Sequence, residues 1–338
     1  MRYHFRTSYS EEIQIYEDRR QLLWYALLII AACLAPFILD EYLLGELTHI
    51  LIWSLAGLGL MLLAGHCGLV SLGHGAFLAC GAYMQYNLVN LSVPFLLAIP
   101  VSGVFSGLVG ALFAIPALRL TGIYLAIATL ALGAIAEDLI IMLEHWTGGV
   151  EGVYLDTGSV LSIEFDRYAQ QIDFASPGHS FYWLCLLVVV LVATGYVNLL
   201  RSASGRALTA IRDSETSARA MGINVARYKT LAFALSCAVT GMAGALLAHF
   251  MGAFNYEAFN LLISIQLLLL ITIGGLGFIQ GAFIGAVLLG LMPLFIVTVR
   301  ESIAGVFNLG NSTIPGIDQA VLAGLLIVFI IIEPAGVY

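Results

Sequence analysis

Ten apolar stretches, each near the length that crosses a bilayer, run through this chain of 338 residues. A transmembrane helix needs about 20 mostly apolar residues because the hydrocarbon core is about 30 Å thick. The stretches cover residues 22–39, 47–65, 70–89, 94–117, 121–143, 181–200, 230–250, 261–276, 282–299 and 319–333. Only 10% of the residues are charged, against about 25% in soluble domains. The sequence therefore predicts an all-α, polytopic membrane protein with about ten transmembrane helices.

The basic residues predict how the chain is oriented. Six of the thirteen lysines and arginines lie in residues 201–229, and Lys and Arg are retained on the cytoplasmic side of a membrane. Residues 144–180 contain six acidic residues and a single arginine, and we predict an external loop there. Ten spans that begin from a cytoplasmic N-terminal arm, residues 1–21, give both segments the expected side. The transmembrane domain is predicted to cover residues 22–334.

The basic segment 201–229 contains a candidate docking helix. Ser214 to Gly222 has the pattern of a short helix that ends at a glycine, and Asn224 is a suitable cap for the next span. A short polar helix between two spans is typical of a contact for a cytoplasmic partner. The residues predicted to make this contact are Ser214, Glu215, Ala218, Arg219 and Gly222.

Two glycine-rich segments, 65–77 and 274–285, interrupt otherwise regular spans. Glycine allows a helix to break where it faces a solute pathway, and it also allows two helices to pack closely. The stretch 70–89 is accordingly either a continuous span or a broken, re-entrant helix. Candidates for lining a pathway are Ser71, Gly73, His74, Gly274, Gly275 and Gly277. Candidates for helix packing, spaced every fourth residue, are Gly277, Gly281 and Gly285.

Other chemistry is sparse in this sequence. Glu137 and Asp138, near the outer end of a span, are either a proton relay or a polar rim, and their proximity to the acidic loop favours the rim. Five scattered cysteines and seven histidines show no ligand spacing, so we expect no metal site. A Walker A loop needs Gly-Lys-Ser/Thr, but the single lysine, Lys229, follows Tyr228. We expect no cofactor in this chain and no nucleic-acid partner; its apolar surface should contact membrane lipid.

Five segments together resemble the branched-chain amino acid ABC permeases of the LivM type, over about residues 45–334. They are Gly68–Phe77 with Gly81–Tyr83, the loop Thr147–Gly152, the cytoplasmic run from Gly205 to Tyr228, Ile273–Gly277 with Gly281, and Glu333-Pro334. The family's coupling pattern, E-A-A-x-x-x-G, corresponds here to Thr216-Ser217-Ala218 followed by Gly222, with the acid displaced to Glu215. After Gly133, where the family carries an acid, this chain has Ala134.

The resemblance implies a type II importer-like permease fold in a bacterial-type cytoplasmic (inner) membrane. It also implies a second homologous permease subunit, an external (periplasmic) solute-binding protein, and two cytoplasmic ATP-binding subunits that hold ATP and Mg. The implied function is ATP-driven import of amino acids, with branched-chain amino acids, other amino acids, and urea or short amides all open as substrates. The alternative from the residues alone is a stand-alone ion- or proton-coupled transporter that uses Glu137 or Asp138.

Overall fold

The computed structural model describes residues 19–117, 120, 122–155, 159–160, 163–164, 177–292 and 324. Its helices are α2 (Arg19–Ile38), α3 (Glu41–Met61) continued by the π-helical turn η1 (Leu62–His66), α4 (His74–Asn90), α5 (Phe95–Ala117), α6 (Ile123–Met142), α7 (Glu144–Thr147), α8 (Pro177–Arg201), α9 (Ala203–Asp213), α10 (Glu215–Ala220), α11 (Val225–Met251), the 3₁₀ turn η2 (Tyr256–Phe259), α12 (Leu261–Gly274) and a last helix, Ile279–Met292. Strand β1 (Val153–Tyr154) pairs antiparallel with β4 (Ala253–Phe254), and β2 (Ser159–Val160) with β3 (Ile163–Glu164).

The prediction of a helical, polytopic membrane protein is confirmed. Within the described residues, six helices are long and apolar enough to cross a membrane, and Ala26–Ile38 and Ile279–Met292 are shorter apolar helices. The predicted stretch 319–333 lies outside the described residues except for residue 324, as do residues 1–18 of the predicted N-terminal arm. The number of ten spans therefore stays a prediction.

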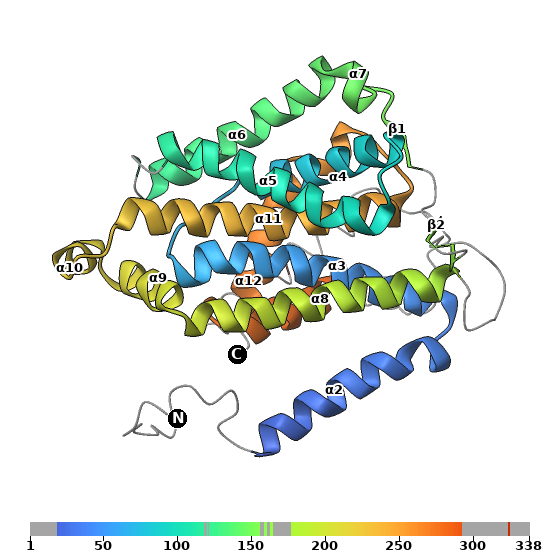
Figure 1. Cartoon of the computed structure of the whole chain (residues 1–338), viewed down its shortest axis with the longest axis horizontal. Helices are drawn as coiled ribbons and strands as arrows, with labels where there is room; N and C mark the ends of the chain where they lie inside the picture. Colours follow the sequence, from blue (N-terminus) through green and yellow to red (C-terminus); the bar gives the residue numbers. More distant parts are fainter. Residues whose placement is uncertain are drawn as a thin grey trace.

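The long helices form a bundle with two distinct ends. Helix α3 packs against α8 and α11, and all three run along the long axis of the molecule (Figure 1). Helices α9 and α10 lie at one end, and α7 and β1 lie at the opposite end (Figure 1). The basic segment 201–229 and the described part of the acidic segment 144–180 are thus at opposite ends, as the charge pattern predicted.

Small residues place α11 at the centre of this bundle, against α3, α4 and α5. A Cβ on Gly81 of α4 would overlap the carbonyl oxygen of Gly241 in α11, and a Cβ on Gly107 of α5 would lie 2.9 Å from the Ala238 Cβ. Lipid tails are as apolar as leucine, so helices in a membrane associate mainly by close packing of this kind. Helix α11 is therefore in close contact with three neighbouring helices.

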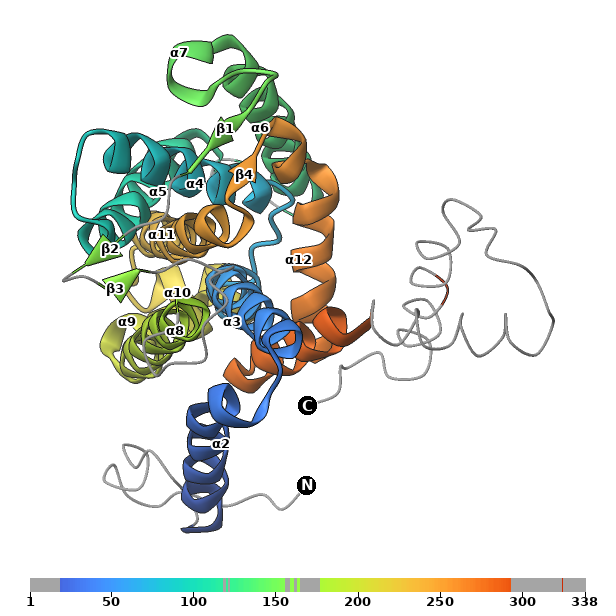
Figure 2. The same cartoon turned by 90° about the vertical axis from the view of Figure 1, so that its right-hand side faces the viewer.

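Both glycine-rich segments depart from regular membrane helices. The chain is non-helical from Cys67 to Gly73, and α4 begins only at His74, so the first four residues of the predicted stretch 70–89 are not helical and the rest forms one helix. Helix α12 is strongly tilted: Figure 2 shows it from the side, while α3, α8 and α11 are seen nearly end-on. It ends at Gly274 because Gly275 and Gly277 take φ values of +109° and +94°, which favour glycine.

Candidate docking site

The polar segment 201–229 folds as two capped helices, α9 and α10. Ser214 ends α9 in an extended conformation, and its Oγ accepts a hydrogen bond of 3.3 Å from the Ser217 N–H at the start of α10. A serine in this position satisfies a backbone donor that has no partner within the helix. Helix α10 therefore begins after Ser214, as the sequence predicted.

The other end of α10 is closed by a Schellman motif. Gly222 has a φ of +84°, its N–H donates to the Arg219 carbonyl, and the Ile223 N–H donates to the Ala218 carbonyl, both at 3.0 Å. Asn224 then caps α11, with its Oδ1 accepting from the Arg227 N–H at 3.1 Å. This geometry fixes the direction in which α10 projects from the bundle.

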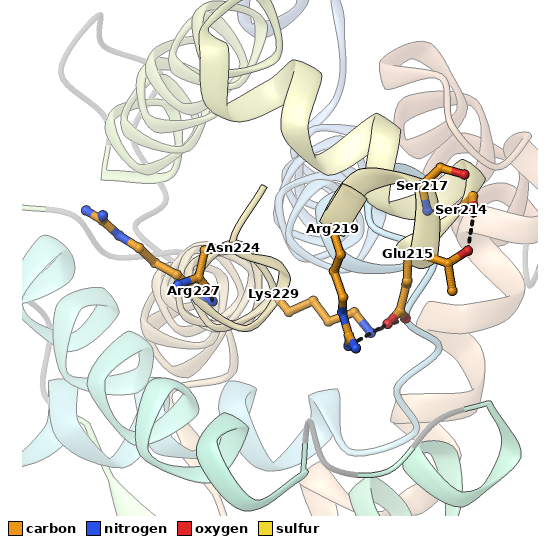
Figure 3. A network of polar contacts seen from close by, with 8 residues as sticks. Ser214, Glu215, Ser217, Arg219, Asn224, Arg227 and Lys229 are labelled. Atoms are coloured by element: carbon orange, nitrogen blue, oxygen red, sulfur yellow. Dashed lines mark hydrogen bonds and ion pairs between the residues drawn. The ribbon is translucent and has the colours of Figure 1, made fainter. Parts of the chain in front are cut away.

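An ion pair between Glu215 and Lys229 fastens α10 to α11. Figure 3 shows Lys229 reaching from α11 to the Glu215 carboxylate, with Arg219 approaching it from α10 at 3.7 Å. The Lys229 side chain is 4% exposed and that of Glu215 35% exposed. Burying an ammonium group costs free energy unless it is paired. Lys229 therefore holds the Glu215 carboxylate in this position. Glu215, predicted as a partner contact, mainly binds within its own chain.

The Lys229 side of this ion pair is buried beside Cys67. Cys67, which follows η1, is buried, and burial raises the pKa of its thiol to about 12. The nearby Lys229 acts in the opposite direction on this pKa, whereas Glu215 adds to the rise. On the buried Lys229 side, the attraction is therefore screened less than at an open surface.

Ala218 corrects one part of the predicted docking face. Its side chain is 0% exposed and belongs to the cluster that contains Leu208, Ile211 and Val225. Its side chain therefore packs α10 against the bundle and is not available to contact a partner. The exposed residues of the helix and its end are Thr216, Ser217, Arg219, Ala220, Met221 and Gly222. Met221 is 69% exposed and is the large apolar side chain of this exposed set.

Most of the first glycine-rich segment is buried, and hydrogen bonds hold its His74 in place. His74 Nδ1 lies 2.9 Å from Ser71 Oγ, and His74 Nε2 lies 2.8 Å from Ser236 Oγ of α11. Ser236 donates its own proton to the Gly59 carbonyl at 2.6 Å, so its oxygen is left to accept the Nε2–H of His74. Gly73 packs against the backbone of Thr129 in α6. These residues tie α3, α4, α6 and α11 together, and a role in lining a pathway stays a prediction.

The second glycine-rich segment packs α12 against the last helix. A Cβ on Gly274 would overlap the Gly281 carbonyl oxygen, and one on Gly285 would overlap that of Leu270. Gly277 departs from the helix-packing prediction because it lies in the loop after α12. Its N–H is 3.3 Å from Met61 Sδ, and a Cβ on Gly65 would lie 2.9 Å from the Gly277 nitrogen. The two segments meet at Gly65 and Gly277, with Arg212 beside them.

Sequence reasoning missed the two side chains that connect these parts, Lys229 and Arg212. The signal for Lys229 was its isolation, since it is the single lysine of the chain and stands at the start of an apolar span. Arg212 was seen only as one of six basic residues in the segment. Its partner, Gly65, is 147 residues away in the sequence, and no local pattern indicates such a contact.

Known proteins have sequences similar to this chain. Residues 42–332 match the family described as "Branched-chain amino acid transport system / permease component". The permease protein LivM of the high-affinity branched-chain amino acid transport system of Escherichia coli K12 is 30% identical over 333 residues, which are 94% of this chain and 75% of the relative. Its counterpart from Salmonella typhimurium is 31% identical with the same coverage.

A probable branched-chain amino acid permease protein of a second type, LivH of Methanocaldococcus jannaschii, is 27% identical over 77% of this chain and 82% of the relative. No solved structure shows significant similarity to the chain. The family match covers most of the chain, including all the segments of the resemblance up to residue 332. The chain therefore belongs to the branched-chain amino acid permease family, and it is a multi-pass, non-enzymatic permease subunit of an ABC importer.

Proposed function

We propose that this permease imports branched-chain amino acids, and that α10 is the surface through which a cytoplasmic ATP-binding subunit drives it. The relatives with the broadest coverage are named as permeases of branched-chain amino acid transport systems, which supports the substrate class. The basic segment 201–229 supports a cytoplasmic position for α9 and α10. The end with α7 and β1 then faces the outside of the inner membrane.

The observation that carries the proposal is the combination of exposure and anchorage in α10. The helix projects at the end of the bundle with Arg219, Ala220 and Met221 exposed. Its other side is fixed to α11 by the Glu215–Lys229 pair and by buried Ala218. A contact surface must be exposed to be bound and anchored to transmit force, and α10 has both properties.

The partner set follows from this placement and from the relatives. Both LivM and LivH of E. coli match the chain, which supports pairing with a second, homologous permease subunit. Each permease then presents one docking helix, so two ATP-binding subunits, with ATP and Mg, complete the cytoplasmic side. An external solute-binding protein would deliver the solute to the end that carries α7, β1 and β4.

The transmission of movement follows the contacts already described. ATP-driven closure of the ATP-binding subunits displaces α10, and the Glu215–Lys229 pair passes the displacement to α11. Ser236 of α11 binds both His74 and the Gly59 carbonyl, so α4 and α3 move with it. The broken segment 67–73 before His74 is where this movement would change access to a pathway.

The docking assignment is tested by placing a charge on the exposed side of α10. Met221→Glu and Ala220→Glu should lower co-purification of the ATP-binding subunits and abolish ATP-dependent uptake, because neither side chain is needed to hold α10 on α11. Ala203→Glu is the matched control, since Ala203 is exposed at the start of α9. A fully assembled and coupled Met221→Glu complex would refute the docking role.

The substrate class is tested separately in vesicles that contain the whole transporter and its binding protein. Labelled leucine, isoleucine and valine should accumulate with ATP and should compete with one another. Urea and acetamide in hundredfold excess should leave leucine uptake unchanged. Uptake of urea in place of leucine would reassign the substrate without affecting the docking assignment.

A further inference from the structure

The side chain of Arg212, in the last turn of α9, lies where the two glycine-rich segments meet. Its Nη1 donates a hydrogen bond of 2.7 Å to the Gly65 carbonyl oxygen in η1. The same nitrogen lies 3.0 Å from the position that a Cβ would occupy on Gly277. The guanidinium group therefore packs directly against the loop that follows α12 while it binds the end of α3.

The aliphatic stem of Arg212 makes a third contact. Its Cγ lies 3.1 Å from the Cβ position of Gly68, the second residue of the non-helical stretch before His74. One side chain from α9 thus touches the end of α3, the start of the broken segment and the loop after α12. The end of α3 also reaches the loop after α12 through Met61, whose Sδ lies 3.3 Å from the Gly277 nitrogen, and through the close approach of Gly65 to Gly277.

The glycines around Arg212 have backbone conformations that suit hinges. Gly68, Gly275 and Gly277 have φ values of +74°, +109° and +94°, and glycine changes between such conformations at low cost. Hinges are a few loop or element-terminal residues that absorb large dihedral changes. A planar guanidinium with five donors can hold such backbones in one arrangement, whereas an ammonium is a point charge with less directional preference.

We propose that Arg212 is a positioning residue that transmits the movement of the docking unit α9–α10 to both glycine-rich segments. The proposal rests on the proposed docking function of α10. Arg212 stands two residues before Ser214, the cap of α10, so a displacement of α10 shifts the guanidinium relative to Gly65 and Gly277. The Glu215–Lys229 pair connects α10 to α11, and Arg212 connects the same unit to α3 and α12.

The test measures solute transported per ATP hydrolysed in the reconstituted full complex. Arg212→Gln should lower this ratio at least tenfold while the ATP-binding subunits stay bound and continue to hydrolyse ATP. Arg206→Gln is the matched control: it removes an equal charge from α9, but the Arg206 side chain binds the Arg201 carbonyl within the same segment. Its ratio should equal that of the unmodified complex.

The other possible outcomes of this experiment also test the proposal. An unchanged ratio in Arg212→Gln overturns it, and so does loss of the ATP-binding subunits, which would make Arg212 part of the docking surface. If Arg212→Gln does not accumulate, Arg212→Lys replaces it, with a ratio lowered at least threefold expected and an unchanged ratio contradicting the proposal. A failure of the proposed docking function is detected separately, because the Met221→Glu complex would then still assemble and couple ATP hydrolysis to uptake.

Discussion

The ion pair between Lys229 and Glu215 joins two residues with different exposure to water. The lysine is almost fully buried, while about a third of the glutamate side chain is exposed. Removing the glutamate leaves a buried charge without a partner, whereas removing the lysine leaves a carboxylate that water and Arg219 can reach. The two halves of one contact should therefore respond differently to mutation.

Glu215→Gln should destabilise the permease more than Lys229→Met does. Breaking a fully buried pair costs about 3–5 kcal/mol, and the exposure of Glu215 places this pair near or below the lower end of that range. Lys229→Met keeps the apolar stem and should cost less than about 1 kcal/mol. Thermal unfolding in detergent measures both. Equal losses of stability, or a larger loss in Lys229→Met, would show that the ammonium is not dependent on the carboxylate.

The thiol of Cys67 reports on the same environment. Its pKa is raised to about 12 from an ordinary value of 9.0, and the thiolate is the reactive form. In a variant whose only cysteine is Cys67, maleimide labelling at pH 8 should be about a thousandfold slower than in the unfolded chain. Because the folded thiol loses its proton only toward pH 12, the labelling rate should still rise above pH 10. A plateau below that pH would contradict the buried environment.

At the level of elements, local sequence patterns predicted the long helices and α10. The same patterns could not predict contacts between distant segments. Hydropathy located the long helices, and Ser214, Gly222 and Asn224 located α10, because capping depends on neighbours in the sequence. The burial of Ala218 and the tilt of α12 depend on packing between distant segments, which no periodicity encodes. Gly277 had the spacing of a packing residue, but the preceding turn at Gly275 placed it in a loop.

Close packing of α12 against Ile279–Met292 should make Gly281 intolerant of a side chain. Gly281→Leu forces these backbones apart, and overpacking of this kind costs about 1–3 kcal/mol. Gly133 of α6 is a matched control because a Cβ there meets nothing within 4 Å. Gly133→Leu should leave the thermal unfolding temperature in detergent unchanged. Equal stability of the two variants would place Gly281 on a face that contacts only lipid.

Glu137 and Asp138 should act as a polar rim of α6 and not as a proton relay. Asp138 is exposed and stands four residues before Met142, the end of α6, on the side of the bundle that carries α7. A carboxylate near the end of a span can keep its water. Glu137→Gln with Asp138→Asn should therefore leave ATP-dependent uptake within a few-fold of normal, also after a protonophore is added. Abolished uptake in an assembled double variant would favour the ion-coupled alternative.

At the scale of the whole molecule, contacts between side chains connect the α10 end of the bundle to its interior. Helix α11 contacts α3, α4 and α5, and α10 is attached to α11 by Glu215 and Lys229. Arg212 and His74 connect the same unit to the two segments where helices are broken. The central claim is that an ATP-binding subunit sits on α10 and moves this network.

Site-specific photo-crosslinking in the assembled transporter tests this claim most directly. A photoreactive residue at Met221 should crosslink to an ATP-binding subunit, and the same residue at Tyr154, which is exposed at the opposite end, should not. The yield at Met221 should change between the ATP-free complex and one trapped with a non-hydrolysable ATP analogue. A crosslink from Tyr154 to the ATP-binding subunit, with none from Met221, would reverse the orientation and contradict the account.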